Sequence, residues 1–252
     1  MLGLNLSLWS AALGKGGTPF AKTDAILGAG GLDYAFFDSA LMSSMFQDAA
    51  GTTPVTAVGQ PVGRANVRRK SPHYANQAVN NSRPALQSGG WKFDGSDDGW
   101  LSDWFCLTGE NCIIAQVDVP ASLAAVATIA GTSTGGSDRW NIRVSNTNGL
   151  LYAGIGDLPT LTIAGAGDLR GKSSIVAVSC DNANASLFAD VLTTSSAKTG
   201  QPLLTNANRV GSGGAGSPAQ FWPGTIKRIA FGRVHITQSQ FQQIRNEWLA
   251  AP

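Results

Sequence analysis

From residue 91 onward the chain repeats one pattern, a short run of apolar residues followed by a turn built from Gly, Asn or Asp. The runs IIAQV, SSIVAV and ASLFADV have the Val, Ile and Ala content of strands in a packed sheet. Asn148 and Gly149 predict a tight hairpin. Many short strands at near-regular spacing favour a sandwich or a jelly roll. The expected strands are 91–94, 99–104, 112–119, 124–130, 138–145, 149–155, 160–164, 173–180, 184–192, 207–211 and 224–234.

One segment near the end of the chain has helical rather than strand periodicity. In ITQSQFQQIRNEWLAA, apolar residues recur at spacings of three or four, which predicts a helix near 238–249 with one apolar face. Thr237 is the expected N-cap, because its hydroxyl can accept a backbone N–H of the first turn.

Composition and charge exclude several classes of protein. Hydrophobic residues make up 43% of the chain, enough to bury a core, so a disordered chain is not expected. The net charge of +2 is too small to predict nucleic-acid binding. The densest basic run, RANVRRK at 64–70, is interpreted as a solvated loop in preference to a phosphate site. No apolar stretch approaches the roughly 20 residues that span a bilayer.

The cysteines and histidines predict neither a disulfide framework nor a zinc site. Cysteines stand at positions 106, 112 and 180, and an odd count is not a disulfide framework, although Cys106 and Cys112 are close enough to pair across a turn. Free thiols fit folding in a reducing cytoplasm. The two histidines, His73 and His235, give no zinc-ligand spacing.

The segment WKFDGSDDGWL at 91–101 concentrates acidic residues between apolar anchors. Asp94, Asp97 and Asp98 offer oxygen ligands for calcium, an ion that takes six to eight of them. Asp and Gly also form turns without any ion, and the turn is the favoured interpretation. We expect Asp94 to accept backbone N–H groups. No cofactor is expected, with calcium kept as an alternative.

Exposed aromatic rings are the usual platforms for stacking on sugars. Four tryptophans flank predicted loops and are candidate glycan-binding residues, with core packing as the alternative for each: Trp100, Trp104, Trp140 and Trp222.

Three blocks together resemble a known family. WKFDGSDDGWL, SSIVAVSCDNANASLFADV and FWPGTIKRIAFGRVHITQSQFQQIRNEWLA resemble the concanavalin A-like jelly-roll modules of the laminin-G type, in the versions found in bacteriophage structural proteins. The resemblance covers residues 41–252, of which 41–90 form a loop-rich lead-in. It implies an all-β jelly-roll sandwich of two antiparallel sheets with a short C-terminal helix.

Residues 1–40 show no strand alternation and are expected to form an extended arm. Their apolar side chains are expected to dock on neighbouring subunits, because an exposed apolar load of this size is unusual in a monomer. The assembly contacts expected in this arm are Leu6, Trp9, Phe20, Tyr34, Phe36 and Phe37.

The carboxylate count argues against catalysis. Sandwich glycosidases need two carboxylates about 5–10 Å apart, and glucanases that share the resembled fold carry them as E-x-D-x-x-E. This chain has only Glu110 and Glu247, neither in such a strand. The histidines have no G-x-S-x-G partner. We therefore expect a protein that is not an enzyme.

These features lead to one functional prediction and two alternatives. The predicted function is a bacteriophage virion structural protein, tail-associated or a capsid accessory. It would be made in the host bacterial cytoplasm and contact other virion proteins and further copies of itself, and its jelly roll would adhere to host-surface glycans. The alternatives are a soluble carbohydrate-binding lectin and, ranked last, a glycoside hydrolase. Neither nucleic acid nor a membrane span is expected.

Overall fold

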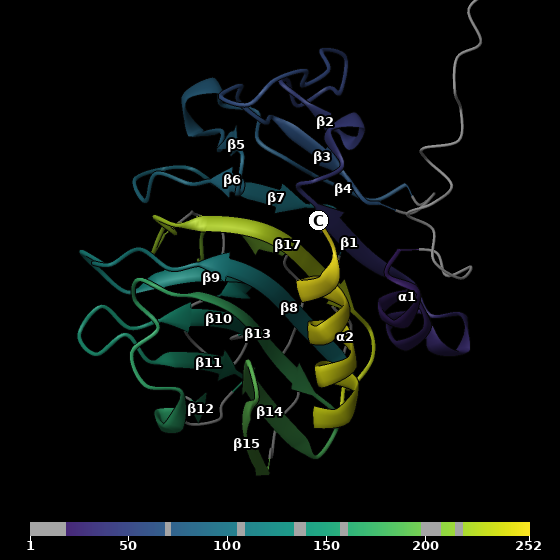
Figure 1. The fold of residues 1–252 in the computed structure, drawn as a ribbon, viewed down its shortest axis with the longest axis vertical. Helices are drawn as coiled ribbons and strands as arrows, with labels where there is room; N and C mark the ends of the chain where they lie inside the picture. The colour runs from purple at the N-terminus through teal and green to yellow at the C-terminus, as the bar shows by residue number, and fades with distance from the viewer. Residues whose placement is uncertain are drawn as a thin grey trace, which may run out of the picture.

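The computed structural model describes residues 19–68, 72–104, 109–133, 140–156, 161–197, 208–214 and 219–252. These residues form an all-β sandwich of two antiparallel sheets with one helix at the C-terminal end, as the sequence predicts (Figure 1).

The first sheet, called sheet A, carries its longest strands in the middle. In spatial order it contains β15 (Leu192–Ala197), β14 (Asn184–Ala189), β13 (Ser173–Cys180), β8 (Asn111–Asp118), β17 (Thr225–Gly232), β6 (Gly90–Lys92) and β5 (Ala85–Gln87), with β1 (Tyr34–Asp38) also paired to β17.

The second sheet, called sheet B, joins strands from both halves of the chain. Its spatial order is β12 (Leu161–Thr162), β11 (Leu151–Ile155), β10 (Trp140–Val144), β9 (Ala127–Ser133), β16 (Arg209–Val210), β7 (Trp100–Ser102), β4 (Tyr74–Asn76), β3 (Arg64–Asn66) and β2 (Met45–Phe46). The short 3-10 turns are η2 (Ala29–Gly31), η3 (Met42–Ser44), η4 (Asn80–Ser82) and η5 (Ala164–Ala166).

Strand alternation places the main core between the two sheets. In β10, Trp140, Ile142 and Val144 belong to this core, whereas Asn141 and Arg143 point to the other face of sheet B. The predicted strand 184–192 is shorter in the structure: β14 ends at Ala189, because Asp190 adopts a left-handed φ of 50° and the chain reverses there into β15.

Two helices cover the outer face of sheet A. α1 (Ala21–Leu27) and α2 (Gln238–Ala250) lie beside each other over this face (Figure 1). The predicted N-cap of α2 is confirmed, because Thr237 Oγ1 accepts the Gln240 N–H at 3.3 Å and Gln240 Oε1 accepts the Thr237 N–H at 2.8 Å. The second apolar cluster joins the helices to the sheet, and it includes Ile114, Ala177, Phe188, Phe241, Ile244 and Trp248. Within the described residues, no helix has the length and hydropathy needed to cross a bilayer.

The described part of the expected arm belongs to the sandwich itself. β1 pairs with β17 along its whole length, from Tyr34 opposite Gly232 to Asp38 opposite Arg228. Tyr34 and Phe36 lie in the cluster under the helices, whereas Phe37 lies in the core between the sheets. Both faces of β1 are therefore buried, which explains why the segment shows no alternation in sequence.

This packing corrects the expected role of four aromatic residues as contacts to other subunits. Phe20, Tyr34, Phe36 and Phe37 are 5%, 2%, 1% and 1% exposed within their own chain. Side chains buried in this way have no surface left to offer a neighbour. The other two expected contacts, Leu6 and Trp9, lie outside the described residues.

Replacing Phe36 with Ala should therefore destabilise the whole domain. The Phe36 ring stacks on Trp248 with centroids 5.2 Å apart and meets Phe20 edge-on at 5.1 Å. Phe-to-Ala changes in cores cost about 3–5 kcal/mol, which chemical denaturation would measure. The control is Val58→Ala, at a position 53% exposed, expected to cost less than about 0.5 kcal/mol. Equal costs for the two variants would mean that β1 is not part of the cooperative domain.

Candidate functional site

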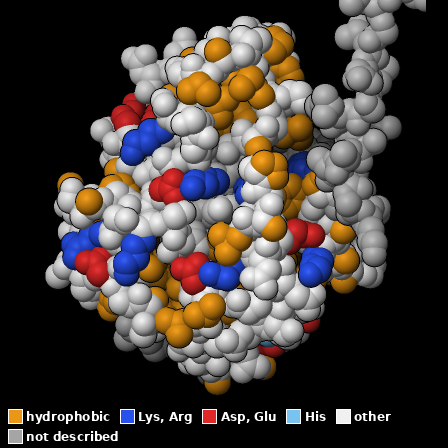
Figure 2. Space-filling model, viewed as in Figure 1, with side chains coloured by type: hydrophobic (Ala, Val, Ile, Leu, Met, Phe, Trp, Pro, Cys, Tyr) orange, Lys and Arg blue, Asp and Glu red, His pale blue; other side chains and the backbone are white. Residues whose placement is uncertain are grey.

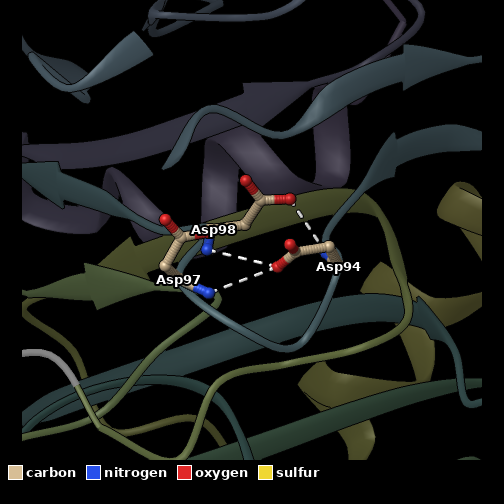
Figure 3. Close-up of side chains that lie close together, drawn as sticks. All are labelled: Asp94, Asp97 and Asp98. Carbon is tan, nitrogen blue, oxygen red and sulfur yellow. Dashed lines mark hydrogen bonds between the residues drawn. The ribbon is translucent and has the colours of Figure 1, made fainter. Parts of the chain in front are cut away.

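The acidic loop between β6 and β7 is a turn closed by its own backbone. Asp94 Oδ1 accepts the N–H groups of Asp97 and Asp98 at 3.3 and 3.4 Å, and Asp98 Oδ2 accepts the Asp94 N–H at 2.8 Å (Figure 3). Asp94 Oδ1 also accepts the Ser96 N–H at 2.8 Å. Asp97 Oδ2 accepts the Ser82 hydroxyl at 2.8 Å. The prediction that Asp94 accepts backbone N–H groups is confirmed.

The three carboxylates do not form a good calcium donor set, although one oxygen from each lies within 4.8 Å of the others. Calcium needs six to eight oxygens free to point at the ion. Two of the oxygens here already face backbone N–H donors, and Asp98 is buried. Burial also raises the pKa of Asp98 to about 6; the Asp94 N–H opposes this rise and the charges of Asp94 and Asp97 add to it.

The tryptophans expected to stack on sugars are core residues. Trp100 is 1% exposed, and Trp104, Trp140 and Trp222 are 0% exposed. Trp100 packs edge-on against Trp91 and donates its indole N–H to the Val62 carbonyl at 2.8 Å. A ring without a solvent-facing side cannot stack on a sugar, so the assignment of these four residues to a glycan site is corrected.

The outer face of sheet B carries a row of polar side chains across its strands. Cross-strand pairs place Arg64 opposite Asn76, Asn76 opposite Leu101, and Leu101 opposite Arg209. Residues paired in this way point to the same side of a sheet. Their neighbours Ala65, Ala75 and Val210 lie in the core, so the row faces outward.

A pocket of about 260 Å³ opens on this row. It is lined by Asn76, Gln77, Asp97, Leu101, Arg209 and Ser212, among others. Gln77 positions the surrounding loop, because its Nε2 donates to the Gly99 carbonyl at 2.7 Å. Leu101 is 43% exposed and provides apolar surface beside the polar groups.

Two side chains of the pocket have unused hydrogen-bonding capacity. Ser212 is 1% exposed, and its hydroxyl has no hydrogen-bond partner among the described residues. A Cβ on Gly99 would lie 2.8 Å from this hydroxyl, so the glycine keeps the space beside it open. The Asn76 amide likewise makes no hydrogen bond with any residue that the structure describes. Sequence periodicity could not identify these residues, because they come from three distant segments.

The histidines and glutamates of the chain have structural contacts. His73 Nε2 lies 2.5 Å from Asp33 Oδ2, and His73 Nδ1 lies 3.3 Å from Asp103 Oδ1. Glu247 on α2 accepts the N–H groups of Lys22 and Thr23 at 2.8 Å, which fixes the start of α1. Glu110 Oε2 accepts the His235 N–H at 3.4 Å, and His235 Nδ1 lies 3.7 Å from Asp181 Oδ2.

Comparison with known proteins finds similarity in structure only. No protein-family model matches the chain, and no curated protein matches it in sequence. Trypanosoma rangeli sialidase in complex with the inhibitor DANA aligns with a TM-score of 0.54 and 15% identity, over 86% of this chain and 33% of the sialidase. The same sialidase with 2,3-difluorosialic acid gives a TM-score of 0.56 and 13% identity. The CBM40 of the Ruminococcus gnavus IT-sialidase bound to α2,6-sialyllactose aligns over 55% of this chain and 84% of its own, with 18% identity and a TM-score of 0.45.

The chain thus spans about a third of the length of the sialidases that it resembles. At this level of identity, the similarity establishes a shared all-β fold.

The expectation that this protein is not an enzyme is contradicted by the comparison. The sialidases, which are enzymes, share its fold over 86% of its length. A pair of glutamates is also too narrow a criterion, because some glycosidases, sialidases among them, use a tyrosine nucleophile in place of a second carboxylate. Counting glutamates therefore does not exclude enzymatic activity.

Replacing Asp98 with Asn should stabilise the protein near neutral pH, by on the order of 1 kcal/mol after solvent screening. Asp98 has a pKa of about 6 in the folded chain against an ordinary 3.8, so the folded state binds its proton more tightly than the unfolded chain does. The contribution of the Asp98 carboxyl to the stability of wild-type protein is therefore greatest below about pH 4 and is lost as the pH rises toward 6. The gain in the Asp98→Asn variant should disappear at pH 4, as measured by chemical denaturation from pH 4 to 8.

The control is Asp48→Asn, which should show the opposite sign. The N–H groups of Thr52 and Thr53 hold the pKa of Asp48 below its ordinary value. This variant should lose stability at neutral pH. If the difference in free energy of unfolding between the Asp98→Asn variant and wild-type protein stays constant with pH, the assignment of the raised pKa is contradicted.

Calcium should leave the thermal stability of the protein unchanged. A site holding calcium at 100 times its dissociation constant would add about 2.7 kcal/mol and raise the melting temperature by several degrees. Because one oxygen each of Asp94 and Asp98 already accepts backbone N–H groups and Asp97 Oδ2 accepts the Ser82 hydroxyl, melts in calcium and in chelator should coincide. A calcium-dependent rise that is lost in Asp97→Asn would instead show that the loop binds the ion.

Proposed function

We propose that this chain is a carbohydrate-binding domain that holds a sugar in the pocket on the outer face of sheet B. The observation that carries the proposal is the set of polar groups turned into that pocket: the Asn76 amide, the buried Ser212 hydroxyl and Arg209. An amide, a hydroxyl and a guanidinium together both donate and accept hydrogen bonds, as sugar hydroxyls require.

The shape of the pocket also supports a small polar ligand. Its volume of about 260 Å³ suits one sugar ring better than a drug-sized molecule, whose sites start at about 300 Å³. The exposed Leu101 offers apolar surface to the C–H face of such a ring. Arg209 lines the same pocket, and its Nε donates to the Gly214 carbonyl at 3.1 Å, which orients the guanidinium.

The arrangement of the sandwich leaves this face available. Helices α1 and α2 cover the outer face of sheet A around Ile114 and Ala177, whereas Asn76, Leu101 and Arg209 line an open pocket on sheet B. The shared fold with sialidases, which act on sugars, agrees with a carbohydrate ligand but supports it through fold alone. Display of the domain on a virion, with other virion proteins and copies of itself as partners, stays a prediction from the sequence resemblance.

A glycan array with purified protein tests the proposal. At least one glycan should bind, and Asn76→Ala and Ser212→Ala should each weaken that binding about 2- to 10-fold, the effect of one lost neutral hydrogen bond. The control is Ser195→Ala on β15, an exposed hydroxyl on sheet A that should leave binding unchanged. Binding that survives both pocket variants would place the site elsewhere, and the absence of any bound glycan would reject the proposal.

A further inference from the structure

A second pocket, of about 380 Å³, lies at the β3 end of the same face. It is formed between η3 and β3, and its lining includes Ser43, Ser44, Arg64, Asn66 and Arg68. Both arginines come from the basic run RANVRRK, which the sequence alone assigned to a solvated loop. No carboxylate lines this pocket among the residues that the structure describes.

Arg64 is held in place but has no acidic partner in the described part of the chain. Its Nε donates to Asn66 Oδ1 at 2.9 Å, and its guanidinium lies 3.9 Å from the centroid of the Tyr74 ring. These contacts orient the planar group without neutralising it, and a guanidinium matches the geometry of a carboxylate or a sulfate. Arg68 differs, because its Nε lies 4.0 Å from Asp38 Oδ2.

Some cations of this protein are paired with acidic side chains. Figure 2 shows Lys and Arg side chains lying next to Asp and Glu over the face that carries α2. Lys227 lies 3.1 Å from Asp118, and Arg245 lies 3.5 Å from Asp190. Arg64 has no such partner among the described residues and lines a pocket without a described carboxylate, so an external anion could bind its guanidinium there.

The two pockets are neighbours on the sheet. Arg64 in the second pocket pairs across strands with Asn76 in the first, and such pairs have Cβ atoms about 5 Å apart. Arg209 lies three strands from Arg64, about 14 Å away at roughly 4.8 Å per strand. A ligand of a few sugar units can therefore fill both pockets. In the first pocket the charge of Asp97 offsets that of Arg209, whereas no described carboxylate lines the second pocket, which favours Arg64 as the partner of the acidic group.

We propose that the ligand is an acidic oligosaccharide, with its carboxylate or sulfate bound by Arg64 in the second pocket and an adjoining sugar unit bound at Asn76 and Ser212 in the first. This inference rests on the proposed carbohydrate-binding function and specifies the class of ligand for that same face.

Matched acidic and neutral glycans test the inference on the unaltered protein. The pairs are oligogalacturonate and its methyl ester, sialyllactose and lactose, and dextran sulfate and dextran, measured by isothermal titration calorimetry. The first two pairs test a carboxylate and the third a sulfate. In at least one pair the acidic member should bind about tenfold more tightly or better, as expected for a charge-assisted contact. Added salt should weaken that preference.

The outcomes separate this inference from the function on which it rests. Equal binding of the acidic and neutral members overturns the acidic ligand and leaves carbohydrate binding intact. Failure of every glycan on the panel and on the array overturns both.

Variants then locate the contact. Arg64→Gln should reduce the affinity for the acidic member about tenfold while leaving the affinity for its neutral partner unchanged, and Arg64→Lys should restore part of the loss. The control Arg170→Gln removes an arginine that is already paired with Asp168 and should have no effect. An acidic preference that persists in Arg64→Gln protein, with its thermal melt unchanged, would overturn the role of Arg64.

Discussion

The buried guanidinium of Arg228 joins parts of this fold that are far apart in sequence. From β17 its Nε binds Asp38 on β1 at 3.2 Å, and its Nη1 binds Gln116 on β8 at 3.0 Å and the Trp248 carbonyl of α2 at 2.9 Å. Arg228 and Asp38 are each 5% exposed. A buried charge of this kind is tolerated only when its partners are all in place. The position of β1 and that of the C-terminal end of α2 are therefore set by one residue.

The helices cover the apolar part of one outer face of the sandwich. With α1 and α2 seated over sheet A, the apolar residues of that outer face are covered, and polar residues occupy the outer face of sheet B. The two pockets lined by Asn76 and by Arg64 open on sheet B, away from the apolar cluster that the helices cover. The acidic loop turns the chain from β6 into β7, with one oxygen each of Asp94 and Asp98 bound to its own backbone.

Much of the fold was predictable because strands, turns and caps depend on neighbouring residues. The strand 173–180 and the capped helix after Thr237 are found where their periodicity and end signals placed them. β1 could not be predicted because both of its faces are buried. It therefore lacks the alternation of apolar and polar residues that marks a strand with one buried face. The candidate site was predictable only in part. The sequence shows Arg64 as part of a basic run, but no pattern in the neighbouring residues indicates that it faces a pocket.

The sequence by itself determined an all-β chain, its principal strands and its C-terminal helix, because hydrophobic period and capping chemistry act over a few residues. The tertiary structure alone decided which aromatic rings are accessible. In the sequence, Trp100 and Trp140 flank predicted loops, as rings that stack on sugars would. In the structure, each faces the opposite sheet and is buried by it. The tertiary structure also brought Asn76, Asp97 and Arg209 to one pocket. Such contacts depend on strand order and register between distant segments, which no local pattern encodes.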